Sequence, residues 1–204
     1  MTEDHRRRAP ATARNREAIL AVLKRHLPSK GKVLEIASGT GEHIVYFAQA
    51  SSTDLVFQPT DPDAAARASI DAWVASYGVS NVRRAIELDA TGEVWPVTSA
   101  DAVLCINMVH IAPWAATEGL VRGAARILPT GGMLYLYGPY RFGDRHTASS
   151  NEAFDAVLRR QNPEWGVRDV EAVVTLATAH RFESPMIEQM PANNVSLVFR
   201  RLPR

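Results

Sequence analysis

The sequence contains only one cysteine, Cys105, and no long apolar run. A single cysteine excludes an intrachain disulfide and a multi-cysteine metal site, which fits a reducing cytoplasm. No stretch approaches the roughly 18 apolar residues of a membrane-spanning helix, and charges stand near the N-terminus where a signal peptide has its apolar core. We therefore expect a soluble cytoplasmic protein that has no metal site and no membrane partner.

The chain also lacks an excess of charge of either sign, with 23 basic against 22 acidic residues. Proteins that bind nucleic acid usually carry excess positive charge to neutralise phosphates, so we predict no nucleic-acid partner. The one basic cluster, residues 5–8, is interpreted as part of a flexible terminus spanning residues 1–10, with binding of an anionic partner as the alternative. A length of 204 residues and 46% apolar content predict a single domain over residues 1–204.

The pattern in residues 33–43 organises the rest of the chain. A short apolar run at 33–36 is typical of a buried parallel strand, and Gly39 and Gly41 then permit a tight turn or a close approach to a ligand. Helical spacing of apolar residues begins at Ile44. A strand, a glycine-rich turn and a helix present backbone N–H groups to a nucleotide-like ligand. Any tight strand-to-helix turn can use two glycines, so a purely structural turn is the alternative.

The residues around these glycines distinguish between two classes of nucleotide-binding protein. A dinucleotide-binding turn has a third small residue where Ile44 stands here, which counts against a nicotinamide-dependent oxidoreductase. Glu35 within the strand and Ser38 before the first glycine instead resemble the corresponding motif of S-adenosylmethionine-dependent methyltransferases.

A second acidic residue has the separation that ribose binding requires. A strand at 55–60 ends at Asp61, which is 22 residues after Gly39, and a helix at 64–77 follows and closes at Gly78. This separation places a carboxylate at the end of the second strand, where it can accept hydrogen bonds from two ribose hydroxyls. The alternative is a helix cap, although Asp63 is better placed for that role.

Further strands are predicted at 82–88, 102–106 and 133–137, and each is followed by polar residues or glycine. In an open parallel sheet the carboxyl ends of the strands line one crevice, so Gly39, Asp61, Asp89 and Asn107 should converge there. Helices are predicted at 12–27, capped by Thr12, and at 115–128 and 169–180, and the strands 186–190 and 195–200 should form a closing antiparallel hairpin. Residues 141–162 interrupt this alternation and form a candidate lid, whose helix would start with a capping box at 149–152.

Seven short stretches spread over the chain resemble a family of small S-adenosylmethionine-dependent methyltransferase-like proteins that includes methyltransferase-like protein 26. They are Ala-Arg-Asn-Arg-Glu at 13–17, Leu-Glu-Ile-Ala-Ser-Gly-Thr-Gly-Glu-His at 34–43, Asn-Met-Val-His-Ile-Ala-Pro-Trp at 107–114, Tyr-Gly-Pro-Tyr at 137–140, Ser-Asn-Glu-Ala-Phe-Asp at 150–155, Pro-Glu-Trp-Gly at 163–166 and Met-Pro-Ala-Asn-Asn at 190–194. The resemblance implies a Rossmann-like class I methyltransferase fold, with a seven-stranded, mostly parallel α/β sheet, a C-terminal antiparallel hairpin and helices on both faces. It also implies S-adenosylmethionine as cofactor and S-adenosylhomocysteine as product, whereas it names no substrate and the sequence predicts no oligomeric state.

The resemblance further implies that the cofactor contacts come from the first strand and its glycine-rich turn, and from the residues that follow the next three strands. These positions are Glu35, Ala37, Ser38, Gly39, Thr40, Gly41, His43, Asp61, Pro62, Asp89, Ala90, Asn107 and Met108.

Methyl transfer needs mainly alignment, and a base matters only when the acceptor carries a proton. His110 is the first candidate for that base because it follows a strand near the expected methyl position. Tyr140 is second and His43 third, and a buried structural histidine is the alternative for both imidazoles. Substrate contacts are predicted for Arg14, Asn15, Trp114, Tyr140 and Asn193.

Two function classes follow from these observations. The first is a methyltransferase acting on a small molecule, and the second is a cofactor-binding protein that has lost catalysis and works through an interaction surface.

The sequence Asn-Met-Val-His after the fourth strand differs from the Asn/Asp-Pro-Pro-aromatic motif of amino-methylating enzymes. Adenine and glutamine side chains are therefore disfavoured as acceptors.

Overall fold

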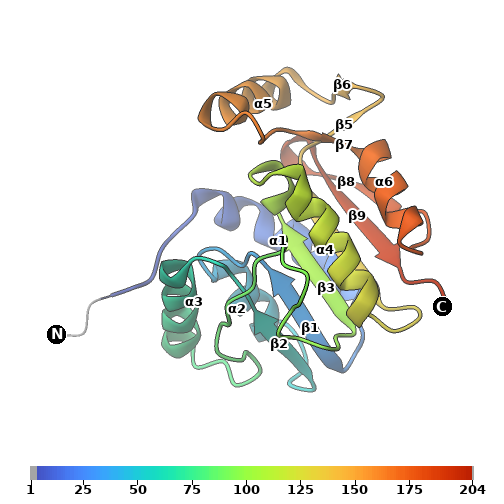
Figure 1. The fold of residues 1–204 in the computed structure, drawn as a ribbon. Coiled ribbons are helices and arrows are strands. Elements are labelled where there is room, and N and C mark those ends of the chain that lie inside the picture. Colours follow the sequence, from blue (N-terminus) through green and yellow to red (C-terminus); the bar gives the residue numbers. More distant parts are fainter. Residues whose placement is uncertain (1–3, 204) are drawn as a thin grey trace.

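The computed structural model describes residues 4–203, which form a mixed sheet with helices on both faces (Figure 1). Part of the predicted flexible terminus, residues 1–3, lies outside the described residues. No helix within 4–203 is long and apolar enough to cross a membrane. In chain order the elements are α1 (Pro10–His26), β1 (Gly31–Ile36), α2 (Glu42–Gln49), β2 (Leu55–Pro59), α3 (Ala64–Tyr77), β3 (Ala102–Ile106), η1 (Met108–His110), α4 (Trp114–Ile127), β4 (Met133–Gly138), β5 (Tyr140–Phe142), β6 (Arg145–His146), α5 (Ser149–Gln161), β7 (Arg168–Asp169), α6 (Val170–Ala179), β8 (Met186–Met190), η2 (Pro191–Asn193) and β9 (Asn194–Arg200).

The main sheet of the described chain has six strands in the order β2-β1-β3-β4-β9-β8. The first four are parallel, whereas β9 is antiparallel to β4 and β8 is antiparallel to β9. The predicted closing hairpin is therefore present. The fold belongs to the α/β class.

The predicted strand at 82–88 is wrong, and the sheet has six strands where seven were expected. This segment touches β2 only through two isolated bridges, Phe57 to Val82 and Thr60 to Ile86. Between the two bridges, side chains form hydrogen bonds with the backbone N–H and carbonyl groups that a strand ladder would use. The N–H of Ala85 donates to Asp71 and the carbonyl of Arg84 accepts from the Gln58 amide.

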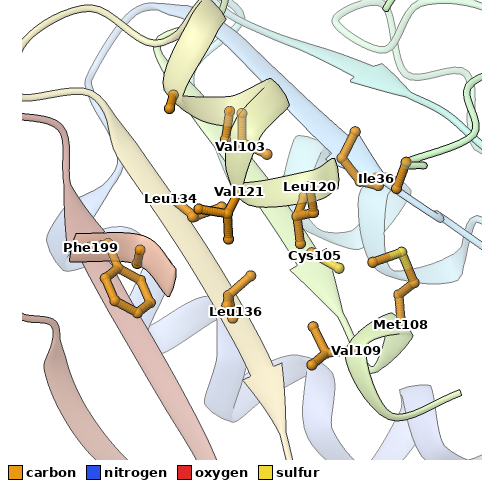
Figure 2. Packing of buried hydrophobic residues seen from close by; sticks show 14 of the residues in the cluster. Ile36, Val103, Cys105, Met108, Val109, Leu120, Val121, Leu134, Leu136 and Phe199 are labelled. Carbon is orange, nitrogen blue, oxygen red and sulfur yellow. The ribbon is translucent and has the colours of Figure 1, made fainter. Parts of the chain in front are cut away.

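Alternating side chains of the strands supply two apolar cores, one on each face of the sheet. Residues such as Val103, Leu134 and Leu136 point to the face that α4 and α6 cover, and Figure 2 shows Leu120 and Val121 of α4 packed over them. The other face packs against α1, α2 and α3. Burial on both faces explains why β3 and β4 are almost continuously apolar.

Several predicted helix ends differ from the observed ones. Thr12 does not cap α1, which begins two residues earlier because proline is favoured in the first helical turn. Helix α5 begins at Ser149 without a side-chain cap, so the predicted capping box is absent. Helix α3 matches its predicted bounds, and it is capped by Asp63 and closed by Gly78 at φ +62°.

Residues 140–169, which we call the cap, form a second layer beyond the end of the main sheet (Figure 1). They contain α5 and the three-stranded sheet β6-β5-β7. The side chain of Asp155 accepts a hydrogen bond from the Val167 N–H at 2.7 Å, which ties α5 to the strand after it. The Asn151 amide donates to the Asn193 carbonyl at 2.9 Å, so the cap is also joined to the turn between β8 and β9.

Candidate functional site

A cavity of about 450 Å³ lies beyond the carboxyl ends of β1, β2 and β3, within the usual size range of small-molecule sites. The chain runs from β1 to β2 on one side and returns to β3 on the other, so the cavity occupies the point where strand order reverses. Its walls are formed by Ile36, Ala37, Gly39, Asp61, Pro62, Leu88, Asp89, Ala90, Thr91, Ile106, Met108, Ile111, Ala112, Pro113 and Ala116.

The turn between β1 and α2 depends on residues that accept positive φ. Ala37, Gly39 and Gly41 have φ values of +56°, +59° and +88°. A Cβ on Gly41 would lie 2.6 Å from the Ile70 Cα, so this glycine lets α2 pack against α3. A Cβ on Gly39 would meet no atom within 4 Å, and Gly39 lines the cavity. The turn therefore leaves space beside Gly39 for a ligand.

The Asp61 carboxylate is fixed at the wall of this cavity. Its Oδ2 accepts a hydrogen bond from the Gly39 N–H at 3.0 Å, and its Oδ1 accepts one from the Asp63 N–H at 2.9 Å. Burial raises the pKa of Asp61, and these two N–H groups oppose the rise. Each carboxylate oxygen can accept a further hydrogen bond. Because Asp63 caps α3, the helix-capping role belongs to Asp63.

Glu35 lies at the same end of β1 but beneath the surface. Only 2% of the residue is exposed, and its Oε2 atom has no hydrogen-bond partner among the described residues. Burial raises the pKa of Glu35 to about 8, with Ser38 lowering it and the nearby Asp61 carboxylate raising it further. The structure therefore holds a buried carboxyl group with an unused acceptor beside the glycine-rich turn.

The structure brings seven of the predicted cofactor residues to the cavity wall: Ala37, Gly39, Asp61, Pro62, Asp89, Ala90 and Met108. The other six lie around the turn or at the end of β3 without lining it: Glu35, Ser38, Thr40, Gly41, His43 and Asn107. The cavity is thus lined by Ala37 and Gly39 of the turn, by the residues after β2 and by residues 88–91.

His110 and Tyr140 contact each other but do not line the cavity. Their ring centroids are 5.1 Å apart with the rings nearly perpendicular, and both residues are buried. Neither imidazole nitrogen nor the Tyr140 hydroxyl has a hydrogen-bond partner of normal geometry in residues 4–203. Burial, followed by the Arg168 charge, lowers the pKa of His110 to about 3, so its ring is neutral at physiological pH.

The cap encloses this histidine. The Gly166 N–H donates to the His110 carbonyl at 2.9 Å, and the Arg168 guanidinium donates to the carbonyls of Val109 and Ala112 at 3.2 and 2.8 Å. The backbone of Gly138 packs so closely that a Cβ there would lie 1.8 Å from His110 Nε2. Access to His110 therefore requires displacement of the cap.

The predicted substrate residues are distributed over three places. The Asn15 Oδ1 accepts a 2.7 Å hydrogen bond from the His43 Nε2–H, while Arg14 is exposed. Burial, followed by the Arg16 charge, lowers the pKa of His43 to about 4. Trp114 lies under the Arg168 guanidinium, and Asn193 binds the cap through its carbonyl. Within the described chain these residues, with Tyr140, do not form one pocket.

The family of the chain follows from a match to residues 6–201 by the family model described as "Protein of unknown function (DUF938)". The chain belongs to this DUF938 family.

Solved structures similar to the DUF938 chain include methyltransferases. A putative O-methyltransferase from Nostoc punctiforme PCC 73102 has 20% sequence identity and a TM-score of 0.81, with 94% of this chain and 57% of that chain covered. An O-methyltransferase family protein from Burkholderia thailandensis has 15% identity and a TM-score of 0.80, with the same coverage of 94% and 57%. A methyltransferase in calicheamicin biosynthesis, in its SAH-bound form, has 16% identity and a TM-score of 0.71, with coverage of 90% and 53%.

The DUF938 chain spans a little over half the length of these three proteins, and the likeness establishes a shared fold.

Sequence reasoning missed the apolar walls of the cavity. Ile36 and Ile106 are the last residues of β1 and β3, and Leu88 precedes Asp89. Their place at the ends of predicted strands, directly before the polar residues, was the signal that could have identified them.

Proposed function

We propose that the protein is an S-adenosylmethionine-dependent methyltransferase that acts on a small molecule. The observation that carries the proposal is the Asp61 carboxylate, held by the Gly39 N–H at the wall of a cavity beyond β1, β2 and β3. The fold shared with methyltransferases supports it. When bound, the cofactor would supply an activated methyl group.

In this proposal the cavity takes the adenosine part of the cofactor. Asp61 accepts hydrogen bonds from the ribose hydroxyls through the lone pairs that its two N–H partners leave free. Ile106, Met108 and Leu88 provide apolar walls for the purine ring, and Asp89 stands at the mouth. The unpartnered Oε2 of Glu35 would accept a hydrogen bond from the ammonium group of the amino-acid end, and the positive charge of that group would lower the raised pKa of Glu35 and favour its ionised form.

On the acceptor side we propose that His110 and Tyr140 take part once the cap has moved. A neutral imidazole with an unused nitrogen can accept a proton from a hydroxyl or ammonium acceptor. The segment 141–162 then acts as the lid. Arg14, Asn15, Trp114 and Asn193 remain proposed substrate contacts, and the acceptor itself is an unidentified small molecule.

The remaining sequence-based expectations complete the proposal. Residues 1–204 form one domain that acts in the cytoplasm without a nucleic-acid partner. The seven motifs support membership of the methyltransferase-like group that includes methyltransferase-like protein 26.

The test of cofactor binding is thermal denaturation in the presence of S-adenosylhomocysteine, with NAD as the control ligand. A ligand that binds only the native state raises the free energy of unfolding, by about 2.7 kcal/mol at a hundred times its dissociation constant, and the melting temperature rises with it. Stabilisation by NAD without stabilisation by S-adenosylhomocysteine would contradict the proposal.

A second candidate function is cofactor binding without catalysis. One observation favours it: the first two candidates for the base, His110 and Tyr140, are buried and do not line the cavity. Transfer of labelled methyl from S-adenosylmethionine to components of a metabolite extract separates the two functions. Binding of S-adenosylhomocysteine without any methyl transfer would favour a cofactor-binding protein that has no catalytic activity.

A further inference from the structure

The described residues before α1 run along α3 (Figure 1). We call residues 4–9 the strap. Two of its guanidinium groups, those of Arg6 and Arg8, lie 5.3 and 4.8 Å from the centroid of the Trp73 ring. The Trp73 indole N–H donates to the Arg7 carbonyl at 2.8 Å, and the Arg7 side chain pairs with Asp63. The strap is therefore held on α3 by backbone as well as side-chain contacts.

Two side chains connect the strap to the glycine-rich turn. The Ser69 hydroxyl accepts from the Arg7 N–H at 2.8 Å and donates to the Thr40 carbonyl at 2.8 Å. The Glu42 carboxylate uses one oxygen, Oε2, to accept from the Ala9 N–H at 2.7 Å and from the Thr40 hydroxyl at 3.0 Å. Both connections meet at Thr40, between the two glycines of the turn.

We infer that the strap positions the cofactor turn, and that Ser69 and Glu42 are the positioning residues that transmit its effect. This inference rests on the proposed function for the identity of the ligand. Neither residue lines the cavity, so any effect on the ligand passes through the conformation of the turn.

The physical basis is that the turn is poorly restrained by its own sequence. Gly39 and Gly41 have more accessible backbone conformations than other residues, so fixing them costs more conformational entropy. External hydrogen bonds at Thr40 reduce the number of conformations that the free turn can adopt. A turn held in its binding conformation before the ligand arrives binds more tightly, because less ordering remains to be done.

The central variants are Ser69→Ala and Glu42→Ala in the full chain. Ser69 is fully buried, and alanine removes only the oxygen that joins Arg7 to Thr40. Ser51→Ala is the matched control, because the Ser51 hydroxyl also bonds a backbone carbonyl, that of Phe47, but lies at the far end of α2. Glu42→Gln is the conservative variant, because its amide keeps an acceptor oxygen while losing the charge.

Two measurements are made on each variant: backbone amide exchange of residues 38–42 and 7–9 without ligand, and the dissociation constant of S-adenosylhomocysteine. Ser69→Ala, which loses two neutral hydrogen bonds, should weaken binding about 5- to 20-fold, and Glu42→Ala, which loses two hydrogen bonds to a carboxylate, should weaken it at least as much. Both variants should raise exchange in the two segments together. Ser51→Ala should change neither measurement. Glu42→Gln should keep affinity within about threefold of wild type, whereas a role limited to the charge at the helix N-terminus would make it as weak as Glu42→Ala.

Unchanged exchange of residues 38–42 in both Ser69→Ala and Glu42→Ala would overturn the inference. Equal losses in Glu42→Ala and Glu42→Gln would overturn the role assigned to the Glu42 oxygen. If exchange rises as expected but wild-type protein does not bind S-adenosylhomocysteine, the coupling between strap and turn holds and the proposed function fails.

Discussion

Replacing Glu35 by glutamine should make the protein more stable at neutral and mildly alkaline pH. Glu35 is buried with one unpartnered oxygen, and burial raises its pKa from the ordinary 4.5 to about 8. Between about pH 4.5 and pH 8, Glu35 is therefore protonated in the folded state and ionised in the unfolded state. Stability then falls as pH rises from 4.5 to 8, because ionising the buried group costs free energy.

The magnitude follows from the size of the shift. Each pKa unit corresponds to about 1.4 kcal/mol, so the full penalty is on the order of 4 to 5 kcal/mol. Two histidines act in the opposite direction at lower pH. Burial lowers the pKa values of His43 and His110 to about 4 and about 3. Because the unfolded state binds more protons than the folded state below about pH 6.5, these two residues make the free energy of unfolding rise as the pH rises to about 6.5. Between pH 6.5 and 8 the Glu35 effect remains alone and amounts to about 2 kcal/mol.

Urea denaturation of wild type and Glu35→Gln at pH 5.5, 6.5, 7.25 and 8 measures this difference. We expect the free energy of unfolding of wild type to fall between pH 6.5 and 8, and that of the variant to stay nearly level. Taking the difference between the two proteins at each pH cancels the contribution of the histidines. Parallel pH profiles for the two proteins would refute the argument that Glu35 is protonated in the folded state.

Three further predictions use other parts of the site. Asp61→Ala should weaken S-adenosylhomocysteine binding by about 1.5 to 3 kcal/mol in calorimetry without unfolding the protein, because hydrogen bonds to a charged acceptor are lost; unchanged affinity would remove Asp61 from the site. His110→Ala should abolish single-turnover methyl transfer while cofactor affinity stays near wild type; full activity would make His110 a structural residue. Gly138→Ala should lower the free energy of unfolding by about 1 to 3 kcal/mol, because its Cβ would lie 1.8 Å from His110 Nε2. Thermal denaturation checks this last prediction, and a neutral Gly138→Ala would contradict the observed packing.

The sequence predicted those parts of the fold whose signal is local and repeated. Helix α3 and strand β3 have the predicted bounds. A helix buried along one side repeats its apolar residues every three or four positions, and a strand buried on both faces is a continuous apolar run, so both patterns are clear in the sequence. The segment predicted as a strand at 82–88 has apolar residues at Val82, Ile86 and Leu88 but forms no continuous ladder. Asp71 and Gln58 take its backbone groups, and such side-chain competition depends on tertiary contacts that no local pattern encodes.

In the candidate site, too, local sequence patterns predicted some residues, whereas others depend on tertiary contacts. Gly39, Asp61 and Asp89 could be placed at one cavity because parallel strands end at a common edge, whereas Asn107, which was expected to converge with them, does not line it. The enclosure of His110 could not be predicted, because it depends on how Gly166 and the rest of the cap fold back over η1. The roles of Ser69 and Glu42 also depend on contacts between segments distant in sequence.

The two edges of the main sheet differ in how much of their backbone remains open to other chains. Residues 81–86 bond to the outer side of β2, for example from the Arg83 N–H to the Phe57 carbonyl at 2.9 Å. Strand β8 is the other edge, and within residues 4–203 no strand pairs with its outer side. Its Met186 and Ile187 are 55% and 42% exposed. Unwanted strand addition and aggregation should therefore begin at β8, and a lysine at position 187 should improve solubility during refolding.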